Sequence, residues 1–255
     1  MPSIPFDILT EILPLLDPGV LAAVARTNKD LSAYALDLIY SHVRCRNMKG
    51  ACQSIASNPG LAVRVHLLEI TPIYHWSTSD VESFLPILRD ALRITINLHT
   101  LILDIQGGHS WVLKPAIGVI TLRSFSCSVY TDQTLLDFLH SQSDLEEIVL
   151  QHSFIPYSRS VPWKFPRLKK LNAPMSWVDT IAPHNPVSHV MISEIVSRAA
   201  ITSLGLTTTS IRQLDIPLHA VHDKPFEELK ALFRELEDLT LTMKFNWATR
   251  TASAA

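Results

Sequence analysis

The chain has 255 residues, 47% of them apolar and 18% charged, so it is long enough to bury a substantial core. Its formal net charge of −2 excludes the sequence-wide basic field that holds nucleic acid or an anionic membrane surface. With only 7 Gly and 16 Pro, the composition also argues against a disordered or low-complexity chain.

The cysteines and the first residues bear on the compartment. Cys45, Cys52 and Cys127 form no Cys-x-x-Cys pair, which disfavours a disulfide framework or zinc ribbon and favours the reducing cytosol or nucleus. Residues 1–7 lack the basic start of a signal peptide, and no stretch of roughly 20 apolar residues indicates a membrane span. We therefore expect a cytoplasmic or nuclear protein that binds neither membrane nor nucleic acid.

The segment up to about Arg46 has the apolar periodicity of three short helices. Ser3 is a suitable cap for the first helix, Pro5 falls in its first turn, and Asp17-Pro18-Gly19 ends it. A second helix follows from Val20, and a third is expected from about Asp30 to Val43. So small a unit has too little interior for all its apolar side chains, so another part of the chain or another protein must cover the rest.

These residues resemble an F-box, a motif that opens with Leu-Pro-x-Glu and continues with paired aliphatic residues. The matching residues are Ile4-Pro5-Phe6-Asp7-Ile8-Leu9, Ile12-Leu13, Leu16-Asp17-Pro18, Leu21, Val24 and Thr27-Asn28-Lys29. Leu38-Ile39-Tyr40-x-x-Val43 is similar to the Leu-Tyr-x-x-Val ending of many mushroom F-box proteins.

The resemblance implies docking on the small Skp-type linker of a cullin–RING ubiquitin ligase. The residues that it implies for linker binding are Pro5, Ile8, Leu9, Ile12, Leu13, Leu16, Leu21 and Val24. The alternative is that these helices only cap the array that follows.

The body of the chain repeats the pattern apolar-x-x-apolar-x-apolar, mostly at the roughly 20–29-residue spacing of leucine-rich repeats. The matches begin at Val65, Leu98, Leu122, Leu145, Leu168, Val187, Ile211 and Leu236. A similar pattern at Ile201 is too close to the next match and is interpreted as a helix face. Between matches, helices are expected after Asp80, Asp132 and Asp223, which implies a parallel sheet with helices on one side.

We therefore predict an α/β fold: an N-terminal three-helix F-box (residues 1–46), an irregular leucine-rich-repeat solenoid (47–245) and a weakly structured tail (246–255). The irregular loops look like those of fungal F-box proteins with divergent repeats. The alternative for the body is an ordinary α/β sheet protein.

Residues suited to catalysis or metal binding form no constellation. His219 and His222 lack further ligands, Asp144, Glu146 and Glu147 are interpreted as a solvated edge, and Cys127 as a buried core residue. The five tryptophans fall in loops, where they serve equally well as binding anchors or as plugs of the array: Trp76, Trp111, Trp163, Trp177 and Trp247. We expect no enzyme activity, no cofactor and no metal.

The leading hypothesis is a substrate-recruiting adaptor of a cullin–RING ubiquitin ligase, whose target, a protein that the sequence does not identify, binds the concave strand face or the tryptophan-bearing loops. A second hypothesis is an interaction scaffold with no ubiquitin-ligase role. A third, an enzyme on an α/β fold, requires a polar pocket with convergent titratable groups, for which the sequence gives no motif.

Overall fold

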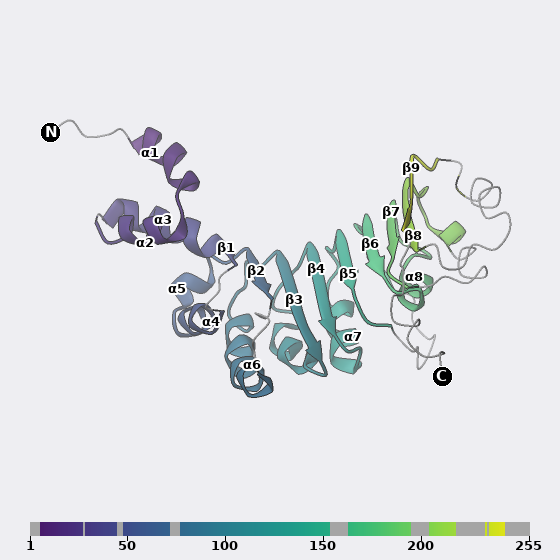
Figure 1. Cartoon of the computed structure of the whole chain (residues 1–255), viewed down its shortest axis with the longest axis horizontal. Helices are drawn as coiled ribbons and strands as arrows, with labels where there is room; N and C mark the ends of the chain where they lie inside the picture. The colour runs from purple at the N-terminus through teal and green to yellow at the C-terminus, as the bar shows by residue number, and fades with distance from the viewer. Residues whose placement is uncertain are drawn as a thin grey trace, which may run out of the picture. The chain divides into compact units, whose positions relative to one another are not determined.

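The computed structural model describes residues 6–27, 29–44, 48–71, 77–153, 163–194, 204–217, 233 and 235–242. The chain divides into two compact units. The first comprises Met1–Arg123 with Asp132–Ser141, and the second comprises Ser124–Thr131 with Gln142–Ala255. Figure 1 labels their helices and strands in chain order.

Short helices precede the first strand: α1 (Phe6–Ile12), the 3-10 turn η1 (Leu13–Leu15), α2 (Pro18–Val24) and α3 (Lys29–Ser41). Pro14 has no N–H to donate to the α-helical ladder, which accounts for the change from α1 to the tighter η1. Pro18 is the first residue of α2, where a missing N–H costs nothing. Leu13, Leu21 and Ala35 are the buried centre of this segment.

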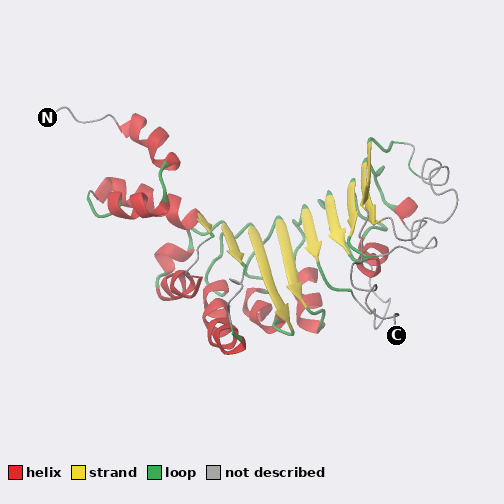
Figure 2. Ribbon diagram, in the orientation of Figure 1, coloured by secondary structure: helices red, strands yellow, loops and turns green. Residues whose placement is uncertain are grey.

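In the first unit, helices pack in a layer on one face of a set of parallel strands. β1 (His42–Val43) pairs with β2 (Leu67–Ile70), which pairs with β3 (Thr100–Gly107). The helices are α4 (Met48–Ser57), α5 (Pro59–Ala62), α6 (Thr78–Leu92), the 3-10 helix η2 (Ser110–Ala116) and α7 (Gln133–His140). In Figure 2, the helices α4, α6 and α7 all lie on the same face of these strands.

Helix α6 shows how the sequence fixes one of these elements. It was expected to begin at an Asp80 cap, but its N-cap is Ser77, which accepts from the N–H of Asp80 at 3.2 Å. Asp80 in turn accepts from the N–H of Ser77 at 3.0 Å, which completes a capping box. The helix buries one face, on which Phe84, Leu85, Leu88, Ala91 and Leu92 lie.

The second unit also consists of parallel strands joined by connections that contain short helices. Its strands are β4 (Ser124–Val129), β5 (Glu147–Leu150), β6 (Lys170–Ala173), β7 (His189–Ile192), β8 (Gln213–Pro217) and β9 (Asp238–Thr242). Each pairs in parallel with the next. The described connections contain α8 (Met175–Ile181) and the short 3-10 helix η3 (Leu204–Leu206).

The strand register explains the apolar pattern of the sequence. In strands β2 to β8 the second apolar residue of each match is buried: Leu68, Leu101, Phe125, Ile148, Leu171, Val190 and Leu214. Leu68 stands level with Leu101, and the five residues of β4 to β8 stand level from each strand to the next, so these side chains pack against their counterparts. The eight predicted strand positions are confirmed as β2 to β9, and the Ile201 match ends in η3; the helix expected after Asp223 lies outside the described residues.

The structure corrects the predicted fold class, a three-helix F-box followed by an irregular leucine-rich-repeat solenoid. The described residues form an α/β structure with a nine-stranded parallel sheet in the order β1 to β9. No separate three-helix module precedes the sheet in the described residues, because α1 breaks into η1 and because α3 ends at Ser41, directly before β1. The described connections range from the 15-residue α6 to the three-residue η3, so they do not repeat one structural unit.

Candidate functional site

The N-terminal helices divide the predicted linker-binding residues into two groups. Leu13 and Leu21 are buried, and Leu9, Leu16 and Val24 pack against them half-buried. Ile8 and Ile12 remain 47% and 43% exposed, whereas Pro5 lies outside the described residues. Five of the eight predicted residues therefore form the segment's own core, and Ile8 and Ile12 stay on its surface.

Two further aliphatic side chains on these helices are exposed. Leu15 in η1 is 83% exposed and Val20 in α2 is 47% exposed. Ile8 and Ile12 are four residues apart on α1, so they stand one above the other on the same helix face. We call Ile8, Ile12, Leu15 and Val20 the exposed aliphatic set. The apolar periodicity does not separate these residues from the core ones, because aliphatic side chains occur on both the buried and the exposed faces of these helices.

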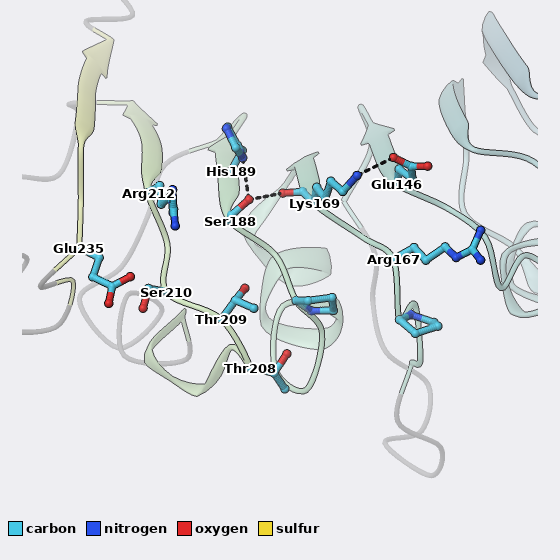
Figure 3. Close-up of a pocket in the computed structure, with 12 residues that line it drawn as sticks. Glu146, Arg167, Lys169, Ser188, His189, Thr208, Thr209, Ser210, Arg212 and Glu235 are labelled. Carbon is cyan, nitrogen blue, oxygen red and sulfur yellow. Dashed lines mark hydrogen bonds and ion pairs between the residues drawn. The ribbon is translucent and has the colours of Figure 1, made fainter.

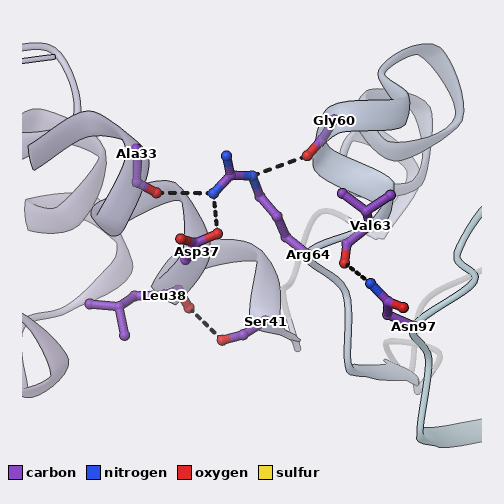
Figure 4. A network of polar contacts seen from close by, with 8 residues as sticks. All are labelled: Ala33, Asp37, Leu38, Ser41, Gly60, Val63, Arg64 and Asn97. Carbon is purple, nitrogen blue, oxygen red and sulfur yellow. Dashed lines mark hydrogen bonds and ion pairs between the residues drawn. The ribbon is translucent and has the colours of Figure 1, made fainter. Parts of the chain in front are cut away.

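Polar contacts join these helices to one another and to the segment of α5. The Tyr34 hydroxyl of α3 donates to the Thr10 carbonyl of α1 at 3.2 Å. Arg64, just after α5, donates from Nη1 to the Ala33 carbonyl at 3.0 Å and from Nε to the Gly60 carbonyl at 3.0 Å. The same guanidinium forms an ion pair with Asp37 of α3 (Figure 4). Arg64 therefore holds α3 against α5.

A groove of about 980 Å³ opens in the second unit, around the residues that precede strands β5 to β9. Its charged lining is Glu146, Arg167, Lys169, Arg212 and Glu235. Ser188, Thr208, Thr209 and Ser210 add hydroxyl groups between them, as Figure 3 shows. Sequence reasoning missed this groove because its residues come from five separate segments of the chain.

Ion pairs along the groove link residues that precede neighbouring strands. Lys169 Nζ lies 2.9 Å from Glu146 Oε2. The other two are longer: Arg212 Nη1 lies 3.4 Å from Glu237 Oε1, and Arg167 Nη1 lies 3.6 Å from Asp144 Oδ1. The cationic side chains are all more than half exposed, so these pairs stabilise the fold little.

The other candidate residues that the structure describes are packed against neighbouring side chains or buried in the core. Cys127 is buried, as predicted, and desolvation raises the pKa of its thiol to about 12, which keeps the sulfur protonated. Trp163 and Trp177 are buried in a T-shaped contact with ring centroids 5.9 Å apart. Trp111 is 38% exposed, with the Arg89 guanidinium 6.0 Å from its ring centroid.

Several predicted candidates lie outside the described residues: Trp76, Trp247, His219 and His222. The acidic residues Asp144 and Glu146 form the ion pairs given above, and Glu147 accepts from the Ser124 hydroxyl at 3.2 Å. Within the described ranges, no three His, Cys, Asp or Glu residues gather as metal ligands would. Within the same ranges, every helix is too short or too polar to cross a bilayer.

No protein-family model matches the chain, and no curated protein is similar to it in sequence.

Proposed function

We propose that the chain is a substrate-recruiting adaptor of a cullin–RING ubiquitin ligase that docks on a Skp-type linker through its N-terminal helices. The observation that carries the proposal is the exposed aliphatic set on α1, η1 and α2. The resemblance of residues 4–43 to F-box sequences supplies the class of partner.

Burial of these side chains would favour association. Fully covering a Leu, Ile or Val side chain contributes about 1.5–3 kcal/mol relative to leaving it exposed, so covering these partly exposed side chains contributes somewhat less for each. The core of this segment, centred on Leu13, Leu21 and Ala35, consists of other residues, which come from α1 to α3. A partner can therefore cover the exposed aliphatic set without opening that core.

In this proposal, the chain positions the target protein and performs no step of the reaction itself. Ubiquitin transfer would be performed by the partner enzymes, and the adaptor would raise the local concentration of the target near them. Arg64 suits this task because it holds α3, which follows the docking helices, against α5. The alternative, an interaction scaffold with no ligase role, predicts no affinity for the linker.

The test is co-purification of the full chain with a recombinant Skp-type linker. The double variant Ile8→Asp/Ile12→Asp should lose most linker binding, because both side chains would place charges in the apolar contact. Leu9 is unsuitable for this test because it packs against the chain's own core. Ile96→Asp is the matched control, since Ile96 is an aliphatic residue of the same unit, 54% exposed, away from α1. Equal recovery of linker by the wild type and the double variant would contradict the proposal.

A further inference from the structure

The groove of the second unit contains an ordered row of charged and hydroxyl side chains. The residues directly before β5 to β9 are Glu146, Lys169, Ser188, Arg212 and Glu237. The backbone N–H groups of Lys169, Ser188, Arg212 and Glu237 each donate to the carbonyl of the preceding member, at 2.8–3.0 Å. The row is therefore fixed by the sheet and does not depend on flexible side chains for its order.

The row has cations on both sides of a hydroxyl group. Lys169 and Arg212 flank Ser188, and adjacent strands are about 4.8 Å apart, so the two cationic residues start roughly 10 Å from each other. Carboxylates stand beyond them, with Glu146 paired with Lys169 and Glu237 paired with Arg212, and Glu235 also lines the groove. The charge order along this row is negative, positive, hydroxyl, positive, negative. Arg167, from the same segment as Lys169, adds a further cation to the groove, and the Ser188 hydroxyl lies 2.8 Å from His189 Nδ1.

This order selects for a ligand with a negative group at its centre. Each cation already has an acidic neighbour, but the pairs are exposed and therefore weak, so an incoming anion can compete for the same cations. Arg212 has five N–H donors in a planar fork that suits a carboxylate, and its pair with Glu237 is made through one nitrogen. The flanking carboxylates repel a second negative charge, which favours a carboxylate over a phosphate dianion.

We propose that this groove binds an extended peptide segment with a central acidic side chain and a basic side chain on either side. The central carboxylate lies between Lys169 and Arg212 near Ser188, and the flanking basic groups face Glu146 and Glu235. The rings of Pro166 and Pro186 add apolar lining for the peptide backbone. The proposal relies on the adaptor function only in identifying this peptide as part of a target.

The experiment is a fluorescence-anisotropy titration of the full chain with a labelled short peptide that carries one glutamate between two lysines. Lys169→Ala/Arg212→Ala should weaken binding by roughly tenfold or more, as expected for loss of charge-assisted contacts. Arg44→Ala is the control, because Arg44 is an exposed arginine paired with Glu69 in the first unit. It should bind the peptide as the wild type does.

Two further peptides test the ligand class. Replacement of the central glutamate by glutamine should weaken binding to the level of the double variant, and replacement by phosphoserine should not strengthen it. No measurable binding of the glutamate peptide, equal binding of the glutamine peptide, or tighter binding of the phosphoserine peptide would overturn the proposal. Ile8→Asp/Ile12→Asp should bind the peptide normally, which separates this result from failure of linker docking.

Discussion

Asn185 accepts a hydrogen bond from the backbone N–H of Phe165 at 2.6 Å, across 20 residues of chain. Its Nδ2 donates to the carbonyls of Trp163 at 2.9 Å and Ile181 at 2.5 Å. Asn185 is 1% exposed, so these backbone groups have no water to replace the amide if it is removed. One side chain thus ties the segment before β6 to the end of α8.

Asn185→Ala should therefore destabilise the protein by about 2–4 kcal/mol, because it leaves buried backbone groups unsatisfied. Urea denaturation followed by circular dichroism measures the change in the free energy of unfolding. Asn97→Ala is the matched control: Asn97 Nδ2 also donates to a backbone carbonyl, that of Val63 at 2.7 Å, but Asn97 is exposed. The control should cost under about 1 kcal/mol, and an equal cost at both sites would contradict the prediction.

Arg64→Ala should loosen α3 more than it lowers the overall stability. The ion pair with Asp37 is partly exposed and contributes little, but the carbonyl of Ala33 also loses its donor. Hydrogen exchange should show faster exchange of the α3 amides, with the amides of β4 to β9 unchanged. Arg89→Ala serves as the control, because Arg89 pairs only with its exposed neighbour Asp90 in the described ion pairs. Unchanged exchange in α3 would mean that Arg64 does not hold this helix.

Stability should fall at high pH through Cys127. Burial raises the pKa of its thiol from 9.0 to about 12, so the folded state retains a proton that the unfolded state releases above pH 9. The contribution is complete below pH 9 and is lost between pH 9 and about 12. The free energy of unfolding of Cys127→Ala, measured over the same pH range, should decline less steeply than that of the wild type. Parallel curves would rule out this thiol as a source of the pH dependence.

Ser77→Ala should destabilise α6 by about 1 kcal/mol, the usual cost of losing an N-cap. The Ser77 hydroxyl and backbone N–H both donate to Asp80, and these bonds lower the pKa of the Asp80 carboxyl. A lowered pKa stabilises the fold above the ordinary value of 3.8, and this contribution disappears as the pH falls below it. Thermal melts at neutral and acidic pH should therefore show a gap between wild type and variant that narrows on acidification. A gap independent of pH would contradict this account.

The sequence predicted the strands better than the faces of the helices. The spacing of apolar residues located β2 to β9, because the buried positions, such as Leu101 and Phe125, recur at the same place in each strand. It missed β1, since His42–Val43 is only two residues long and follows α3 without a turn signal. It also assigned both Ile8 and Leu9 to the linker-binding surface, although Ile8 is exposed and Leu9 packs against the core.

The groove could not have been predicted by any local motif. Glu146, Lys169, Ser188 and Arg212 meet only because the strands stack in register, and their spacing in sequence varies with the length of each connection. The one available signal was a polar residue directly before each apolar strand. That signal is ordinary for a sheet edge, and its functional meaning depends on which charges become neighbours.

α3 leads directly into β1, so no linker residues separate the N-terminal helices from the first strands. Ser41 ends the helix, His42 begins the strand, and the N–H of His66 donates to the carbonyl of Ser41 at 3.0 Å. A protein bound to α1 would thus have a fixed orientation relative to β1, β2 and β3. In a ligase, such an attachment would limit which lysines of a bound target come within reach, and a flexible insertion after Ser41 should broaden that choice.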